Sequence, residues 1–416
     1  MLEYLENLDA PIRSAISRAI RDALDELSDQ HPSLFHDFLS AAIEIYKESA
    51  KPPATIYNEF GMVAKSSLDQ KDPWEVRSGI ATTYKEIAPI FPESELVSFV
   101  AFLIEDGALG DKEPNVRQEM QDAGISILNL HAKSSVDVLM PIIEKCLGAK
   151  HNGSEEQNRI KESAIVLYGT LARHLDDDTR LPPIIERLIA TLRAPSENVQ
   201  FAVSETLPPL AKRADGEKIS KYVERLLNQL FAGNKYSERR GAAFGLAGLV
   251  KGVGISALAD YDIIRSLSAA LEDKKDPKKR QGVQFAFETL SMSLGRYFEP
   301  YAIEILPLLL TSLGDASGEV REATADAAKG IMKHTTSYGI KQLVPLALDF
   351  FNQSQWRSKK GAVELLGTMA YLDPRQLSES LSDIIPEIVG ALNDTHKEVQ
   401  DRFFKLLKNP SILYAL

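Results

Sequence analysis

Apolar side chains along this chain recur every three to four residues in short runs, which is the spacing of one buried face on an α-helix. One such run contains Ile303, Leu306, Leu309, Leu310 and Leu313. These runs predict a first helix, A, in each of nine segments: 34–48, 93–106, 135–148, 179–193, 218–231, 261–272, 300–313, 338–352 and 378–392. Pro307, Pro345 and Pro386 fall inside three of them, where proline is expected to bend the helix.

A second pattern has a longer period, because a Val-Arg-like pair recurs about every 40 residues. The pairs are Val76-Arg77, Val116-Arg117, Ile160-Lys161, Val199-Gln200, Arg239-Arg240, Lys279-Arg280, Val320-Arg321, Lys359-Lys360 and Val399-Gln400. Small or apolar residues follow several pairs four and seven positions later, as at Ala243 and Leu246, so each pair marks a second helix, B. Two-helix repeats of this length are typical of HEAT proteins. The sequence therefore predicts an all-α superhelix (solenoid) of about ten helix-turn-helix repeats, which offers a long surface rather than an enclosed active site.

Two segments depart from the regular repeat. An earlier B helix fits at Ile12-Arg13, but its distance to Val76 exceeds one repeat by about 24 residues. The surplus lies in a polar, proline-led loop at residues 49–72, which is either a tolerated insertion or a partner contact. After Val399-Gln400 the chain ends on apolar residues, whereas natural solenoids end on a polar cap. We therefore expect the chain to be a piece of a longer array.

The net charge of −11 is unevenly distributed. Residues 231–416 carry 23 basic and 22 acidic side chains, whereas residues 1–230 carry 25 and 37. Charge thus divides one continuous array into an acidic first half, with the 49–72 insertion, and a second half able to meet an anionic partner. The single cysteine, Cys146, is expected to be a plain buried thiol in a reducing, cytoplasmic environment. The sequence contains neither a run of 18 apolar residues nor the features of a signal peptide.

Few residues suggest catalysis or a cofactor. The sequence contains no Gly-Lys dipeptide and therefore no Walker-type phosphate loop. The glycines of residues 241–254 alternate with apolar residues, which favours close helix packing over phosphate binding. The histidines lack zinc-site spacing, and Asp176-Asp177-Asp178 is more typical of a helix cap than of a cation site. The sequence therefore predicts a protein that is not an enzyme, without catalytic, metal or cofactor sites.

The remaining candidates are basic residues that share the phase of the repeat. Those at the start of the B helices in the second half are Arg239, Arg240, Lys278, Lys279, Arg280, Arg357, Lys359 and Lys360. Lys251 and Lys274 lie close to them in sequence and are supporting candidates. One hypothesis is that their side chains project as a ladder and bind phosphates or acidic proteins. The alternative is that they pair with an aspartate of a neighbouring turn.

The stretches KYSERRGAAFGLAGLVKGVGI (235–255) and LEDKKDPKKRQGVQFAFETLSMSLGRYFEPY (271–301) resemble a family. It is the large HEAT-repeat translational activator of general amino-acid control, in its region similar to translation elongation factor three. The resemblance continues through GDASGEVREATADAAKGIM (314–332), QWRSKKGAVELLGTMAY (355–371) and DTHKEVQ (394–400). WEVRSGIATTY (74–84) and LARHLDDD (171–178) extend it upstream.

This resemblance implies a scaffold that docks on ribosomal RNA or acidic ribosomal proteins. It also implies that the scaffold helps sense stalled or collided ribosomes in amino-acid starvation, so that the initiation factor 2 alpha kinase is activated. The kinase and an ATP-binding-cassette partner are expected to bind regions outside this chain, and no membrane or small-molecule substrate is implied. The competing interpretation is a generic protein scaffold of the phosphatase-scaffold or transport-receptor type. Binding by such a scaffold should depend only weakly on salt, whereas phosphate contacts depend on it steeply.

Overall fold

The computed structural model describes residues 5–7, 9–28, 30–51, 72–149, 154–349, 356–368 and 396–401. Within these residues the chain forms helices and turns, without a strand, which confirms the all-α prediction. It divides into two compact units, residues 1–184 and 185–416. The boundary lies inside one helix, so the position near residue 230 where the charge balance changes falls within the second unit.

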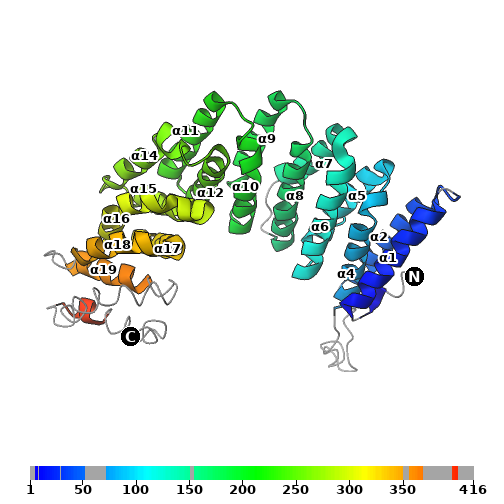
Figure 1. Ribbon diagram of the computed structural model, residues 1–416, viewed down its shortest axis with the longest axis horizontal. Coiled ribbons are helices and arrows are strands. Elements are labelled where there is room, and N and C mark those ends of the chain that lie inside the picture. Colours follow the sequence, from blue (N-terminus) through cyan, green and yellow to red (C-terminus); the bar gives the residue numbers. More distant parts are fainter. Residues whose placement is uncertain are drawn as a thin grey trace, which may run out of the picture. The chain divides into compact units, whose positions relative to one another are not determined.

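Among its described residues, the first unit contains seven complete α-helices and the start of an eighth. They are α1 (Ala10–Leu27), α2 (Leu34–Ala50), α4 (Trp74–Glu86), α5 (Leu96–Ile104), α6 (Pro114–His131), α7 (Val136–Gly148), α8 (Glu155–Arg173) and the start of α9 (Leu181–Thr191), with short 3-10 turns η2 (Ala88–Ile90), η3 (Glu93–Glu95), η4 (Ala108–Gly110), η5 (Ala132–Ser134) and η6 (Asp178–Arg180). Helices α1, α4, α6 and α8 pack on one another in this order as the B layer, and α2, α5 and α7 cover them as the A layer (Figure 1).

The second unit repeats this two-layer arrangement. Its helices are α10 (Glu197–Ala211), α11 (Gly216–Ala232), α12 (Tyr236–Val253), α13 (Ala257–Asp260), α14 (Ile263–Leu271), α15 (Pro277–Leu294), α16 (Glu299–Leu313), α17 (Gly318–His334), α18 (Ser337–Asp349) and α19 (Trp356–Thr368), with the 3-10 turn η7 (Gly295–Phe298). Helices α10, α12, α15, α17 and α19 form the B layer, and α14, α16 and α18 pack in sequence in the A layer (Figure 1).

The helices fall where the apolar spacing predicts them. Eight of the nine expected A helices coincide with observed ones, and the ninth, 378–392, lies outside the described residues together with Pro386 and most of the 49–72 loop. In α16, Leu306, Leu309, Leu310 and Leu313 are buried as expected, whereas Ile305 takes the buried place that Ile303 was expected to fill. Pro307 and Pro345 lie inside α16 and α18. Each unit is thus a stack of HEAT-type helix pairs.

The glycine-rich segment 241–254 serves helix packing, as its pattern indicates. A Cβ atom added at Gly241 would lie 2.0 Å from the carbonyl oxygen of Leu192, and one at Gly248 would lie 2.7 Å from that of Ser204. Real Cβ atoms do not approach a backbone oxygen this closely, so these glycines allow α12 to lie directly against the backbone of α10 and of the turn that follows α9.

A buried arginine links successive turns of the first unit. Arg77 is fully buried, and its guanidinium donates to both carboxylate oxygens of Asp111 at 2.6 and 3.1 Å. It also donates to the carboxylate of Asp72 and to the carbonyl oxygen of Ser49. Burial alone would lower the pKa of Arg77, but these hydrogen bonds to Asp72 and Asp111 outweigh it and raise the pKa. The charge is therefore retained and fully paired.

Other described features agree with the sequence. Asp177 caps η6 by accepting the backbone N–H of Thr179, so the acidic triplet begins a helix as expected. Cys146 is a half-buried thiol, less enclosed than expected, and its burial raises its pKa. Among the described helices, none has an apolar stretch sufficient to cross a bilayer.

We expect Gly241→Ala to lower the free energy of unfolding by more than about 2 kcal/mol, because the added methyl group must push α12 away from Leu192. Gly330→Ala provides the control, since its Cβ would meet only ordinary contacts at 3.8 Å and alanine favours the helix by up to about 1 kcal/mol. Urea denaturation of both variants measures the difference. Equal stability of the two variants would contradict the packing argument.

We expect Arg77→Ala to cost about 3–5 kcal/mol, because it leaves the buried carboxylate of Asp111 without its counterion. Lys145→Ala removes an exposed pair with Glu105 and should cost less than about 1 kcal/mol. Thermal and urea unfolding, followed by helical circular dichroism, compare the two. A loss for Arg77→Ala no larger than that for Lys145→Ala would rule out a stabilising role.

Candidate functional site

The basic residues at the start of the B helices in the second unit begin with Arg239 on α12. Its side chain is 3% exposed, and it donates to the carbonyl oxygens of Gly233 and Asn234 in the preceding turn. It also donates to Oε1 of Gln281 on α15 at 2.6 Å. Arg239 therefore ties its own turn to the next B helix.

Arg280 repeats the arrangement of Arg77 one unit further along the chain. Its Nε and Nη2 donate to the two carboxylate oxygens of Asp315 at 2.8 and 3.0 Å, and its Nη1 donates to the carbonyl oxygen of Asp273 at 2.7 Å. Asp315 also accepts the backbone N–H of Ser317, and its carbonyl oxygen accepts a bond from Arg321. Burial by itself would raise the pKa of Asp315, but these donors, Arg280 foremost, lower it below its ordinary value.

Arg240 is 8% exposed and lies on the B-helix face of α12. Its guanidinium makes a two-pronged ion pair with Glu288 of α15 and is within 3.5 Å of Glu197. The rings of Phe244 and Phe285 lie 5.2 and 5.1 Å from its central carbon, which adds cation–π attraction. Burial alone would lower its pKa, but the pairing with Glu288 outweighs this effect and raises it.

The expectation that these three arginines project as a ladder from the surface is therefore wrong. All three are buried. The alternative, pairing with an aspartate of a neighbouring turn, describes Arg280, whereas Arg240 pairs with Glu288 within α15 and Arg239 donates to carbonyl oxygens and to Gln281. A guanidinium has five donors in a planar fork, which suits it to carbonyl and carboxylate acceptors between tightly packed turns. The sequence could not distinguish the two arrangements because both require arginine at the same phase of the repeat.

The candidate lysines are more exposed. Lys251 pairs with Glu205 at 2.9 Å, and Lys279 pairs with Asp273 at 3.5 Å while lying over the ring of Phe231. Lys274 and Lys275 on the turn before α15, and Lys278 in the first turn of α15, are exposed, and no ion pair joins them to a described residue. Lys359 and Lys360 on α19 are half-buried, and the side chain of Arg357 lies outside the described part of the chain.

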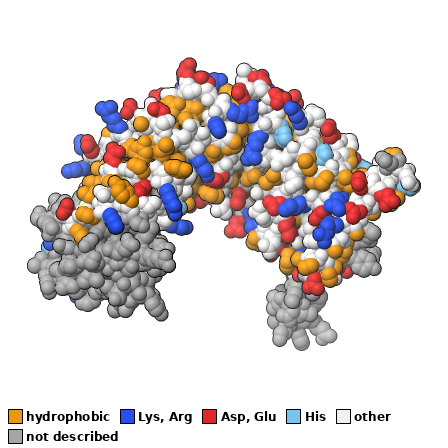
Figure 2. All heavy atoms as spheres, viewed as in Figure 1, with side chains coloured by type: hydrophobic (Ala, Val, Ile, Leu, Met, Phe, Trp, Pro, Cys, Tyr) orange, Lys and Arg blue, Asp and Glu red, His pale blue; other side chains and the backbone are white. Residues whose placement is uncertain are grey.

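The basic start of α15 is compatible with the helix dipole because Asp276 caps it. The Asp276 carboxylate accepts the backbone N–H groups of Lys278 and Lys279 at 2.9 and 3.1 Å. This negative charge at the N-terminus offsets the unfavourable position of the lysines. We name the three exposed residues Lys274, Lys275 and Lys278 the turn lysines. On the face shown in Figure 2, basic side chains of the second unit are interspersed with acidic and hydrophobic ones rather than gathered in one patch.

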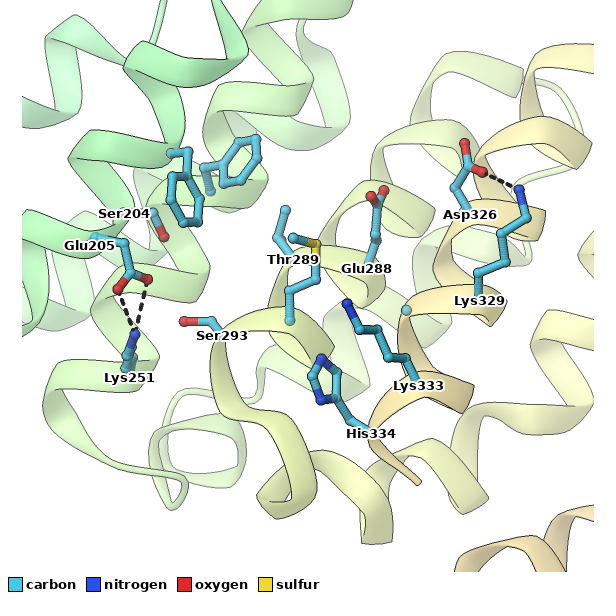
Figure 3. A pocket seen from close by; sticks show the side chains of 14 residues that line it. Ser204, Glu205, Lys251, Glu288, Thr289, Ser293, Asp326, Lys329, Lys333 and His334 are labelled. Carbon is cyan, nitrogen blue, oxygen red and sulfur yellow. Dashed lines mark hydrogen bonds and ion pairs between the residues drawn. The ribbon is translucent and has the colours of Figure 1, made fainter. Parts of the chain in front are cut away.

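The structure also contains a groove that sequence reasoning missed. It has a volume of about 710 Å³ and lies on the B-layer face of the second unit, lined by α10, α12, α15 and α17 (Figure 3). Apolar side chains, among them Phe201, Phe244 and Met292, line it together with charged residues. In the sequence these apolar residues were indistinguishable from the helical core, and only the register of each helix shows which of them face solvent. We name this cavity the B-face groove.

The described residues contain no group of His, Cys, Asp or Glu arranged to hold a metal ion. Ion pairs engage five charged side chains that line the B-face groove: Glu205, Lys251, Glu288, Asp326 and Lys329. The arrangement is suited to binding extended surfaces of other macromolecules.

We expect the contribution of Asp315 to stability to be present above about pH 4, the ordinary pKa of aspartate, and to be lost as the pH falls through its lower folded value. Asp315→Asn should therefore be less stable than the parent chain by about 3 kcal/mol at pH 7, and the gap should narrow below pH 4. Urea denaturation between pH 3 and 7 measures it. A gap independent of pH would contradict the ion pair with Arg280.

Comparison with known proteins agrees with this geometry. A family model described as "Stalled ribosome sensor GCN1, HEAT repeats" matches residues 1–173, and one described as "EF3 N-terminal HEAT repeat" matches residues 239–403. Among solved structures, the karyopherin Kap121p bound to the SUMO protease Ulp1p is similar with a TM-score of 0.51 and 12% identity, over 97% of this chain and 40% of that one. At this identity the likeness shows the helical-repeat fold alone.

Curated relatives are more similar in sequence. The eIF-2-alpha kinase activator GCN1 of Saccharomyces cerevisiae is 50% identical over 389 residues, which are 90% of this chain and 14% of that protein. The stalled ribosome sensor GCN1 of Homo sapiens is 38% identical over 408 residues, 96% of this chain and 15% of that protein. The chain thus spans only about a seventh of the length of these relatives. With both HEAT-repeat matches and these identities, the chain belongs to the GCN1 family.

Proposed function

We propose that this chain is a non-enzymatic, cytoplasmic scaffold that attaches to ribosomes and takes part in sensing stalled or collided ones. The observation that carries the proposal is the 50% identity, over 90% of the chain, to a protein named as an activator of the eIF-2-alpha kinase. The match of residues 1–173 to repeats of a stalled ribosome sensor also supports it. In this proposal the kinase, which responds to amino-acid starvation, and an ATP-binding-cassette partner bind outside this chain.

The turn lysines are the side chains that we propose meet ribosomal phosphates or acidic ribosomal proteins. Lys274, Lys275 and Lys278 are exposed, and Asp276 fixes the backbone between them through its cap. Their ammonium groups are therefore available without breaking an ion pair with any described residue. Lysine binds phosphate as a point charge, so these contacts would be insensitive to base sequence.

The other candidates take supporting roles in this proposal. Lys251, Lys279, Lys359 and Lys360 are partly exposed and extend the basic surface, and Arg357 is retained as a candidate from the sequence alone. Arg239, Arg240 and Arg280 are buried, so we assign them the role of holding the turns on which the lysines lie. Charge reversal at these arginines would disrupt the fold and would not test binding.

We expect the triple variant Lys274→Glu, Lys275→Glu, Lys278→Glu to weaken co-sedimentation with ribosomes. Each phosphate contact contributes about 0.7–0.9 to the slope of log affinity against log salt, so three lost contacts should lower the slope by about 2–3. Binding measured between 50 and 200 mM salt tests this expectation. If the chain were a generic protein scaffold, the affinity of both the parent chain and the triple variant for ribosomes would depend only weakly on salt.

The matched control replaces Lys212, Lys218 and Lys221 with glutamate. These lysines are exposed in the same unit, at the end of α10 and on α11, and the variant has the same net charge. It should bind ribosomes more tightly than the turn-lysine variant. If both variants lose the same affinity while remaining folded, the contact depends on net charge alone and the turn lysines are not the site.

A further inference from the structure

The B-face groove exposes apolar surface that the helical core does not use. Phe201 on α10 is 49% exposed, Met292 on α15 is 48% exposed, and both line the groove beside the buried ring of Phe244. Phe201 and Phe244 contact each other edge to face, with ring centroids 6.3 Å apart. Exposed aromatic and thioether side chains within a concave surface are typical of contact sites for other proteins. The volume of about 710 Å³ accommodates a few side chains rather than a folded domain.

Most charges around the groove are already neutralised by partners within the chain. Lys251 pairs with Glu205, and Lys329 pairs with Asp326 (Figure 3). Glu288 forms an ion pair with Arg240. These three carboxylates therefore have cationic partners, and an incoming ligand gains little from the two paired lysines.

Lys333 differs from the other lysines of the groove. It is exposed in the last turn of α17, and no ion pair joins it to any residue that the structure describes. Figure 3 shows its ammonium extending into the groove on the side of Glu288, whose carboxylate is taken by Arg240. The adjacent His334 is half-buried, and burial, with a smaller effect of the neighbouring lysine charge, lowers its pKa, which favours a neutral ring at pH 7. The groove thus carries one unbalanced positive charge beside an apolar floor.

This combination does not suit a nucleic-acid strand. A phosphate backbone needs several free cations in a row, whereas here two of three lysines are neutralised. The ion pairs of Glu205, Glu288 and Asp326 leave Lys333 as the one lysine of the described groove lining without a paired acid, which is too few for a phosphate backbone. One free ammonium in the same groove as exposed Phe and Met side chains complements a ligand that carries a single carboxylate and a bulky apolar side chain.

We propose that the B-face groove binds a short protein segment in which a large apolar side chain lies next to an acidic one. The apolar side chain packs on Phe201, Phe244 and Met292, and the carboxylate pairs with Lys333. This inference does not rest on the proposed ribosome attachment, since it uses neither the turn lysines nor the family relationship. Sequence-blind phosphate binding and this selective contact would therefore occupy different surfaces of the second unit.

The test selects ligands from a random 12-residue peptide library displayed on phage, with the whole chain immobilised. Enriched peptides are synthesised with a fluorescent label, and their affinities are measured by anisotropy. We expect Asp or Glu adjacent to Phe, Leu, Ile or Trp to be enriched. Failure of the library to yield a peptide whose binding depends on the groove would overturn the proposal.

Two substitutions probe the two halves of the contact. Lys333→Glu should weaken an enriched peptide about tenfold by placing like charges together, and Phe201→Ser should weaken it about tenfold by removing apolar contact area. Both residues are exposed, so melting curves should show that both variants fold. A peptide with lysine in place of its acid should bind Lys333→Glu better than the parent chain, which a general structural effect would not produce.

Matched controls lie outside the groove. Lys218→Glu makes the same charge change on α11, and Tyr297→Ser removes an aromatic ring that is more exposed than Phe201. Neither should change peptide affinity more than about twofold. If the controls weaken binding as much as the groove variants, or if a 12-nucleotide single-stranded RNA displaces the peptide from the groove, the proposal is wrong. Loss of ribosome binding by the turn-lysine variant leaves this result unaffected, so the two proposals fail separately.

Discussion

The stacking of the repeats depends on one recurring contact: a long polar side chain at the start of a B helix that is turned inward to the backbone of the preceding turn. Arg117, Lys161, Gln200, Arg239, Arg280 and Arg321 all donate to carbonyl oxygens that end the preceding helix or form its turn. These carbonyls have no partner within their own helices, and neighbouring repeats shield them from water. Two of the buried arginines at this phase also have a counterion, which Asp111 supplies to Arg77 and Asp315 to Arg280.

This contact separates residues that hold the frame from residues that are free to bind. Arg280 cannot leave its acceptors for a phosphate without leaving the carboxylate of Asp315 and the carbonyl oxygen of Asp273 unpaired. The side chains of the turn lysines make no such contacts. Asp276 caps the helix through backbone N–H groups and leaves their ammonium groups in solvent. Adjacent positions in one turn thus serve stability and, in our proposal, attachment to the ribosome.

In the B-face groove, too, residues that stabilise the fold lie beside residues that we propose bind a partner. Arg240 pairs with the carboxylate of Glu288 and contacts the rings of Phe244 and Phe285. It therefore neutralises a negative charge beside the apolar side chains of the groove. Glycines on α12 bring α10 and α12 into backbone contact, which places Phe201 beside Phe244. The groove therefore follows from close helix packing and from the pairing of its charges.

The sequence alone determined the helix pairs, their positions and the repeat, because apolar spacing and a 40-residue period depend only on local geometry and on the need of each pair to bury one face. It also supplied the family, through stretches such as 235–255 and 271–301. It did not determine where Arg239, Arg240 and Arg280 point. Whether an arginine at a fixed phase meets solvent or an aspartate about 35 residues later depends on the distance between successive turns, which only the stacked helices set. For the same reason the sequence could not separate Phe201 and Met292 from the core, since a small rotation of a helix moves an apolar side chain from a buried contact to an open groove.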